Sequence, residues 1–326
     1  MYFIGVDGGG TKTAAILTDL KGDIMRRTRT GSGNITMLDR GSVAQLINGL
    51  ITDLLKEDAP QSVGYATLGF AGGSGERPRK TVSNLLHRNG IQAFSILTDA
   101  MNMYLAAFDN KQGILLAAGT GSTCLTKDDA GNFIKIGGCG YLLSDEGSGY
   151  DIGNMAIRKF IQAAAAGKKR SPLASEVLHF YGMSDENELI SEIYASLRPH
   201  WLIASCAETI CEAAVNGDPD ALDCIDRAAK ALFEMVDIAQ KRIGGSDGVR
   251  LSLAGSILGR ATIVRQKFDE QLSTVHWLKE LVEQKYKPEV AALFHAIRTA
   301  GYEVSEELHQ RLKIKFSDYR LKVQKV

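Results

Sequence analysis

The 326-residue chain lacks several features that mark other classes of protein. Its longest nearly apolar stretches, residues 114–118 and 160–166, fall far short of the ~20 residues that span a bilayer. No basic segment precedes an apolar run at the start, so we expect no signal peptide, a cytoplasmic location and no membrane partner. Lys+Arg and Asp+Glu number 38 each, and this balance gives no positive excess for binding nucleic acid.

Cysteine is scarce, and its spacing excludes the usual cysteine-based sites. The five cysteines form no CxxC pair, and the six histidines do not lie near them at the spacing of zinc ligands. An odd number of cysteines without an export signal is typical of reduced thiols. We therefore expect the cysteines to pack in the interior rather than to bind metal: Cys124, Cys139, Cys206, Cys211 and Cys224.

What the sequence does contain is a glycine turn between two strands, near its start. Residues 2–6 form an apolar run, the sequence DGGGTKT occupies 7–13, and residues 14–19 form a second strand-like run. A strand, not a helix, follows the glycines, and GxxxxGK[ST] is absent. The turn is therefore neither a dinucleotide fingerprint nor a Walker A loop.

The same arrangement returns later in the chain. Residues 114–118 form an apolar run, GTGS occupies 119–122, and residues 124–127 continue as a strand. When the sequence is shifted by 109 residues, Gly10 falls on Gly119 and Thr11 falls on Thr120. A duplication of the strand–turn–strand unit is the favoured interpretation.

Such glycine turns are suited to binding phosphate. Glycine lets the backbone approach an anion closely, and the exposed N–H groups of the turn form a nest for its oxygens. Thr11, Lys12 and Thr13 add hydroxyl and ammonium donors. Asp7 could hold Mg²⁺ through water, since this ion prefers oxygen ligands and keeps much of its hydration. The alternative is an ordinary hairpin turn.

Strands and helices alternate between the two repeats, which favours α/β layers. Asp99 ends the predicted strand 94–98 and precedes a predicted helix, 100–107. A carboxylate at that point of an α/β layer faces the crevice where ligands bind, and it could accept a proton from a hydroxyl. The alternative is a helix N-cap, a position that aspartate favours. After residue 150 the sequence is mostly helical.

Two later segments are rich in glycine. Residues 137–149 (GGCGYLLSDEGSG) hold five glycines and two adjacent carboxylates. They form either a ligand-contacting segment or a plain loop. Residues 255–259 (GSILG) follow a buried strand, 249–254, and suit a backbone that lies against a flat adenine ring.

Together and in this order, these motifs resemble the N-acetylglucosamine kinase-like branch of the actin, sugar-kinase and Hsp70 ATPase superfamily. That branch also contains activator ATPases of acyl-CoA dehydratases and benzoyl-CoA reductase. The resemblance covers residues 1–300 and implies an α/β fold of two RNase-H-like domains around an ATP cleft, the second enlarged by helices. It predicts a first domain over 1–112, a second over 113–300 and a charged, helical tail over 301–326.

The resemblance implies an ATP- and Mg²⁺-dependent kinase that phosphorylates a hydroxyl, the 6-OH, of an amino sugar, with a homodimer as the expected assembly. N-acetylglucosamine is the first choice, while glucosamine, N-acetylmannosamine, N-acetylmuramic acid and glucose are alternatives. An activator ATPase, which would share an iron–sulfur cluster through exposed cysteines, is a rival. A non-catalytic, filament-forming ATP-binding protein is another.

The resemblance also assigns roles to residues, with Asp99 as catalytic base and Asp7 as the magnesium contact. It implies that ATP is bound by Gly9, Gly10, Thr11, Lys12, Thr13, Gly119, Thr120, Gly121, Gly255 and Ser256. It implies that the sugar is bound by Asn34, Gly72, Ser122, Thr123, Gly138, Cys139, Gly140, Tyr141 and Asp145. The family usually has tryptophan where this chain has Cys139 and often glycine where it has Ser144, which leaves the particular sugar open.

Overall fold

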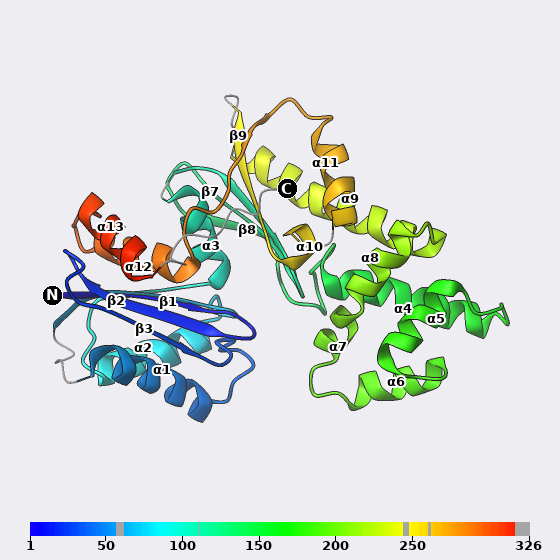
Figure 1. Ribbon diagram of the computed structural model, residues 1–326, viewed down its shortest axis with the longest axis horizontal. Coiled ribbons are helices and arrows are strands. Elements are labelled where there is room, and N and C mark those ends of the chain that lie inside the picture. The colour runs from blue at the N-terminus through cyan, green and yellow to red at the C-terminus, as the bar shows by residue number, and fades with distance from the viewer. Residues whose placement is uncertain (57–61, 110, 244–247, 260–261, 317–326) are drawn as a thin grey trace. The chain divides into compact units, whose positions relative to one another are not determined.

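The computed structural model describes residues 1–56, 62–109, 111–243, 248–259 and 262–316. The chain folds into two compact units, the first made of Met1–Lys111 and the chain from Glu283 onward, the second of Gln112–Val282. Each unit is built on a five-stranded sheet (Figure 1). Within the described residues, no helix has both the length and the apolar character needed to cross a membrane.

The first sheet has the strand order β3-β2-β1-β4-β5. Its first three strands form an antiparallel meander, whereas the last two run parallel to β1. The strands are β1 (Tyr2–Gly8), β2 (Thr13–Asp19), β3 (Met25–Thr30), β4 (Val63–Phe70) and β5 (Phe94–Leu97). The carboxyl ends of β1, β4 and β5 therefore lie at one edge of the sheet, which is where ligands bind in α/β folds.

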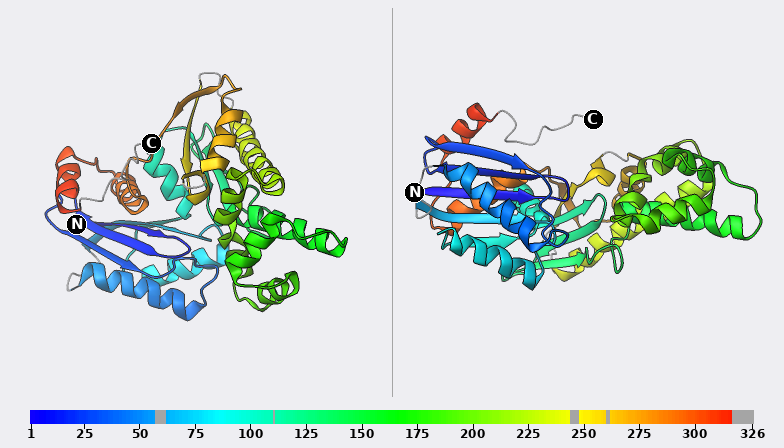
Figure 2. Two further views of the ribbon diagram at one scale, coloured as in Figure 1. Left: turned by 45° about the vertical axis from the view of Figure 1, so that its right-hand side comes forward. Right: turned by 90° about the horizontal axis from the view of Figure 1, so that it is seen from below.

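Helices cover both faces of this sheet (Figures 1 and 2). Ile4 and Val6 of β1 pack with α1 and α2, while Phe3, on the opposite face, packs with α12 and α13. This alternation follows from the two-residue period of a strand. The helices of this unit are α1 (Arg40–Leu55), α2 (Glu76–Arg88), α3 (Asp99–Phe108), α12 (Pro288–Thr299) and α13 (Glu306–Lys315).

Gly5 allows α12 to cross β1 at close range. A Cβ atom at this position would lie 2.2 Å from the Glu289 carbonyl oxygen and 2.3 Å from the Leu293 nitrogen. We expect Gly5→Ala to lower the free energy of unfolding by about 1–3 kcal/mol, because the two backbones must separate. The matched variant Gly49→Ala, in α1 with no described atom within 4 Å of its Cβ, should raise it by about 0.5–1 kcal/mol. Urea unfolding measures both, and an equal change in the two variants would contradict this packing.

The end of the first unit differs from the expected domain boundaries. We expected residues up to 300 to belong to the second domain, but α12 lies on the first sheet, with Val290, Leu293 and Phe294 buried beside Phe3. The apolar spacing of α12 shows that one face is buried but not which sheet it covers. The tail, expected to be charged and helical, contains α13, but Leu308 and Leu312 of this helix are buried in the same cluster. Residues 317–326 of the expected tail lie outside the described residues.

The second sheet repeats the topology of the first, with the order β10-β9-β6-β7-β8. A meander of three antiparallel strands is again followed by two strands parallel to its first member. Its strands are β6 (Ile114–Ala118), β7 (Ser122–Lys127), β8 (Phe133–Gly137), β9 (Val249–Ala254) and β10 (Leu278–Leu281). The strand–turn–strand repeat predicted from the sequence is confirmed, and so is the two-domain α/β fold.

The second unit is enlarged by helices, as expected. Helices α4–α8, green in Figure 1, gather beyond one end of the second sheet. The full set is α4 (Gly149–Ala165), α5 (Pro172–Tyr181), α6 (Glu186–Ala195), α7 (Pro199–Ser205), α8 (Ala207–Val215), α9 (Pro219–Arg242), α10 (Ser256–Gly259) and α11 (Thr262–Leu272). Four of the five cysteines are buried here as free thiols, and Cys139 alone is exposed.

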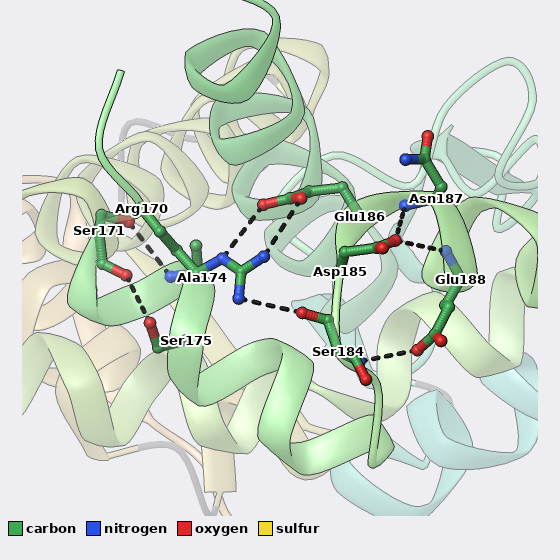
Figure 3. A network of polar contacts seen from close by, with 9 residues as sticks. All are labelled: Arg170, Ser171, Ala174, Ser175, Ser184, Asp185, Glu186, Asn187 and Glu188. Carbon is green, nitrogen blue, oxygen red and sulfur yellow. Dashed lines mark hydrogen bonds and ion pairs between the residues drawn. The ribbon is translucent and has the colours of Figure 1, made fainter. Parts of the chain in front are cut away.

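Polar contacts fix the corner between α5 and α6 (Figure 3). The Ser171 side chain caps α5 by accepting the Ala174 N–H, and the Asp185 carboxylate caps α6 by accepting two backbone N–H groups. The Arg170 guanidinium pairs with the Glu186 carboxylate at 3.4 Å, which joins the two helix starts. Both helices therefore begin at a side-chain cap, and an ion pair connects their first turns.

Candidate active site

The first glycine turn joins β1 to β2 and is closed by the Gly9 N–H, which donates to the Lys12 carbonyl at 2.9 Å. The loop after β3 packs directly against it: the Gly33 N–H donates to the Gly9 carbonyl at 2.9 Å. A Cβ atom on Gly33 would lie 2.4 Å from the Gly8 Cα. The loop at Gly33 packs on the Gly8–Gly9 side of the turn, and Thr11 and Lys12 stay exposed at the surface of the unit.

Asp7 and Asp99 lie at the edge of the first sheet where the carboxyl ends of β1, β4 and β5 meet. The Asn102 side chain, from α3, donates to the Asp7 carboxylate and to the Val6 carbonyl, both at 2.9 Å. The pKa of Asp7 is raised to about 7, chiefly by burial, with smaller contributions from the carboxylates of Asp99 and Glu289 and against the opposing effect of the hydrogen bond from Asn102. Burial also raises the pKa of Asp99. Two carboxyl groups that interact and resist ionisation form a centre suited to a cation or to proton transfer.

The alternative role of Asp99 as a helix N-cap is taken by its neighbour. The Thr98 hydroxyl caps α3 by accepting the Met101 N–H at 3.2 Å. Asp99 is the first residue of the helix, and one of its carboxylate oxygens accepts the Ala100 N–H at 2.9 Å. The helix start thus holds the carboxyl group in place without using it as the cap.

The raised pKa of Asp7 predicts a pH-dependent stability for the free protein. Between its ordinary pKa of 3.8 and about 7, the folded state keeps a proton that the unfolded state has lost. The free energy of unfolding therefore falls as pH rises through this window. Asp7→Asn removes the titrating group. Between pH 4 and pH 8 we therefore expect the free energy of unfolding to fall by about 1–4 kcal/mol less in the variant than in the wild type. Chemical unfolding without nucleotide or Mg²⁺ measures this, and equal slopes in the two proteins would contradict it.

The structure also brings together two predicted sugar contacts, Asn34 and Gly72. The Asn34 side-chain oxygen accepts the Thr36 hydroxyl at 2.7 Å, and the Ile35 N–H donates to the Ala71 carbonyl at 3.1 Å. Gly72 has a φ of +75°, and a Cβ atom there would lie 2.5 Å from the Thr36 hydroxyl oxygen. The loops after β3 and β4 are thus packed on each other near the first glycine turn.

In the second unit, a cavity of about 610 Å³ adjoins the second glycine turn. Gly119, Thr120 and Ser256 line it, so two segments that the sequence assigned to ATP meet at one cavity. The neighbouring Gly255 has a φ of +90° and packs on the backbone of Ala118. Helices α7 and α8 supply further lining residues, among them Trp201, Glu208 and Glu212, and Asn216 lines the cavity just after α8 ends.

Sequence reasoning missed the contribution of α7 and α8. It predicts a mostly helical chain after residue 150 but does not predict the turn at Cys206, where α7 ends and α8 begins. The turn lets Trp201 and Glu208 line the same cavity. Pro199, a favoured first residue of a helix, was the signal for the start of α7.

Residues 137–149 fold back onto the second glycine turn. The Ser122 N–H donates to the Asp145 carboxylate at 3.4 Å, and a Cβ atom on Gly121 would lie 2.8 Å from that carboxylate. Burial raises the pKa of Asp145, whose φ is +72°. Close packing on a glycine turn thus positions the predicted sugar-binding carboxylate.

Of the remaining predicted sugar contacts, Ser122 and Thr123 lie in β7, and the others follow β8. Gly138 has a φ of +65°, and a Cβ atom there would lie 2.6 Å from the Thr123 hydroxyl oxygen. Cys139 and Gly140 are exposed. The Tyr141 ring stacks on His200 of α7, with ring centroids 4.7 Å apart. One helix therefore contributes to both the cavity and the segment 137–149.

The predicted site residues form one group in each unit. The first group contains Asp7, Gly9, Gly10, Thr11, Lys12, Thr13, Asn34, Gly72 and Asp99. The second contains Gly119, Thr120, Gly121, Ser122, Thr123, Gly138, Cys139, Gly140, Tyr141, Asp145, Gly255 and Ser256. Their roles in binding and catalysis stay predictions.

Known proteins resemble this chain along most of its length. The profile of the BadF/BadG/BcrA/BcrD ATPase family matches residues 4–296. An N-acetylmuramic acid/N-acetylglucosamine kinase of Clostridium acetobutylicum is 25% identical over 288 residues, which cover 87% of this chain and 94% of that protein. The glucosamine kinase GspK of Vibrio cholerae is 25% identical over 303 residues, or 92% of this chain and 96% of that protein.

Solved structures share the fold. A candidate N-acetylglucosamine kinase of Chromobacterium violaceum superposes with a TM-score of 0.72 at 23% identity, covering 90% of this chain and 97% of that one. This likeness agrees with the two repeated sheets and with the helical enlargement of the second unit.

Proposed function

Because the chain belongs to the BadF/BadG/BcrA/BcrD ATPase family, we propose that it is an ATP-dependent kinase that phosphorylates a hydroxyl group of an amino sugar. One observation supports this most directly: Gly119, Thr120 and Ser256, assigned to ATP from separate motifs, line a single cavity. The relatives named above act on amino sugars, and they match this chain over most of their length. We further propose that the protein is cytoplasmic and that it forms a homodimer. Light scattering of the purified protein tests the dimer.

The cavity of the second unit suits the adenosine end of ATP. Trp201 and Ile257 offer apolar surface for a flat ring. Glu208 and Glu212 can accept hydrogen bonds from ribose hydroxyls, and their charge disfavours phosphate near α8. The phosphates then belong at the Gly119–Thr120 end, where backbone N–H groups can meet them. The turn at Gly9 and Gly10 of the first unit stays a predicted phosphate contact.

Asp7 fits the Mg²⁺ that accompanies ATP. The described residues contain no cluster of three or more His, Cys, Asp or Glu that could hold a metal by itself. Magnesium needs no such cluster, since it keeps several waters and takes one or two carboxylates plus phosphate oxygens. The mutual repulsion of Asp7 and Asp99 is the electrostatic condition that a bound cation relieves. When bound, Mg²⁺ neutralises charge on the phosphates.

In the proposed reaction, Asp99 accepts the proton of the sugar 6-OH as that oxygen attacks the γ-phosphorus in line, while the bond from the γ-phosphorus to the β-phosphate oxygen breaks and ADP leaves. Its pKa, raised by burial, makes it a better base than an exposed aspartate. The start of α3 holds one of its carboxylate oxygens. Such positioning supplies most of the rate enhancement in phosphoryl transfer.

N-acetylglucosamine is the proposed substrate. Asn34, Gly72 and Asp145 are among the residues proposed to contact it, with Ser122, Thr123, Gly138, Cys139, Gly140 and Tyr141. Polar groups that hydrogen-bond an N-acetyl group would be left unpaired by a sugar that lacks it, so the enzyme should discriminate against such a sugar.

A coupled ADP-release assay with Mg·ATP and a panel of sugars tests the function. The panel holds N-acetylglucosamine, N-acetylmuramic acid, N-acetylmannosamine, glucosamine and glucose. We expect sugar-dependent ADP release with the highest kcat/KM for N-acetylglucosamine. If no sugar raises ADP release above the basal rate, the kinase assignment is wrong. The rival activator role is disfavoured by the burial of four of the five cysteines.

Trp201 provides a test of the adenosine site. Stacking of a base on an aromatic ring is worth ~1–3 kcal/mol, so we expect Trp201→Ala to raise the KM for ATP about tenfold. The KM for the sugar should change little. Tyr194→Ala, which removes an exposed aromatic ring of α6, is the matched control. Steady-state kinetics decide, and an unchanged KM for ATP would place adenosine elsewhere.

A further inference from the structure

A separate cavity of about 800 Å³ lies within the first unit, between the start of α1, helix α2 and the loop after β3. Four cationic side chains line it: Arg40, Arg77, Lys80 and Arg88. We call it the basic cavity. None of the residues proposed above to bind ATP or the sugar lines it.

The positive charge of the basic cavity is uncompensated. Arg77, Lys80 and Arg88 share one face of α2, since they are spaced by three and then eight residues. No acidic side chain is among the described residues that line the cavity. The four cations make no ion pair or side-chain hydrogen bond with other described residues. Like charges gathered in this way repel one another, and a bound anion relieves that repulsion.

Most of the remaining lining residues are apolar, and Thr36, Thr81 and Asn84 are the polar ones. Ile35 and Val43 are 4% and 3% exposed, and Leu85 packs beside them. An apolar floor beneath charged groups accepts a carbon skeleton as well as an anion. A volume of this size lies in the range of small-molecule sites, ~300–1,000 Å³.

We propose that the basic cavity binds a small phosphorylated organic molecule of the sugar phosphate class. Arginine is the residue best suited to this role, because its planar guanidinium donates two parallel hydrogen bonds to a phosphate. Nucleic acid is a poorer fit, since the chain has no net charge and these cations line a cavity rather than an open stripe.

One residue that lines the basic cavity is hydrogen-bonded to a predicted sugar contact. Thr36 lines the cavity, and its hydroxyl donates to the Asn34 side chain at 2.7 Å. The residue that a ligand in the cavity would contact, Thr36, therefore lies two positions after Asn34 in the same loop. If the proposed kinase function holds, its product belongs to the ligand class of this cavity, and binding there would regulate the enzyme.

Isothermal titration calorimetry with glucose 6-phosphate tests the binding. A saturating non-hydrolysable ATP analogue with Mg²⁺ and N-acetylglucosamine keeps the proposed active site filled. We expect R77Q/K80Q to weaken binding at least about tenfold, since two charge-assisted contacts are lost. K21Q/K313Q removes two exposed cations of the same unit and should change the affinity less than about twofold. Lys80→Glu alone should also weaken binding, and circular dichroism checks folding.

Two further probes identify what the cavity recognises. Neutral glucose should not bind, and inorganic phosphate should bind more weakly than glucose 6-phosphate. Equal affinity for inorganic phosphate would overturn the sugar part of the proposal. Absence of binding to the wild type at ~10 mM, or equal binding to R77Q/K80Q, would overturn the site itself. These titrations measure binding and need no turnover. Their outcome therefore still tests the basic cavity if the kinase assay fails.

Discussion

Asp99→Asn should lower kcat by about 10²–10⁴-fold, the usual contribution of a general base. The amide keeps the shape of the side chain and can accept the Ala100 N–H, but it cannot take a proton from the sugar hydroxyl. Because Thr98 caps α3, the helix start does not depend on the Asp99 charge. Removing a buried carboxyl group with a raised pKa should leave the fold intact or slightly more stable.

Asp109→Asn is the control for this experiment, because Asp109 lies just beyond the other end of the same helix. It is exposed, pairs with Arg298 and has a φ of +58°, which asparagine tolerates. We expect its kcat to match the wild type. Steady-state kinetics with saturating Mg·ATP and sugar measure both variants. An Asp99→Asn enzyme that keeps more than half of the wild-type kcat would remove Asp99 from the mechanism.

Local signals in the sequence were sufficient for the parts of the fold that depend on backbone geometry. The two glycine turns predicted paired antiparallel strands, and β1–β2 and β6–β7 have that pairing. The duplication predicted two similar sheets, and their strand orders agree. The sequence predicts Asp99 at the end of a strand, and the structure puts it at the start of α3, with Thr98 alone between it and β5. Turn chemistry and strand periodicity act over a few residues, which is why one sequence reveals them.

The parts that depend on distant packing were not predictable in this way. The apolar face of α12 is plain in the sequence, yet nothing in its spacing says that Phe3, nearly 290 residues earlier, is its partner. The short strand β10 has one half-buried residue and three exposed ones, so it lacks an apolar alternation. Trp201 reaches the cavity of the second unit only because the chain turns at Cys206. The basic cavity is likewise visible only once α1 and α2 are packed side by side.

Gly255→Ala should disrupt the proposed ATP site through a single added methyl group. Gly255 has a φ of +90°, a conformation that alanine rarely adopts, and its Cβ would lie 2.2 Å from the Ala118 carbonyl oxygen. Ala118 ends β6 directly before Gly119, so relief of this clash must move the strand end that carries the second glycine turn. Strain and overpacking together should lower the free energy of unfolding by about 3 kcal/mol.

The same displacement should weaken nucleotide binding, because Ser256 and Thr120 line the cavity from the two segments that the new methyl group pushes apart. We expect the Kd for ATP to rise at least about tenfold, as measured by calorimetry at a temperature where the variant is folded. Gly259→Ala, at the other end of α10, is the control, since its Cβ meets no described atom within 4 Å. That variant should keep both stability and affinity. A Gly255→Ala protein with wild-type affinity would mean that the cavity beside the second glycine turn is not where ATP binds.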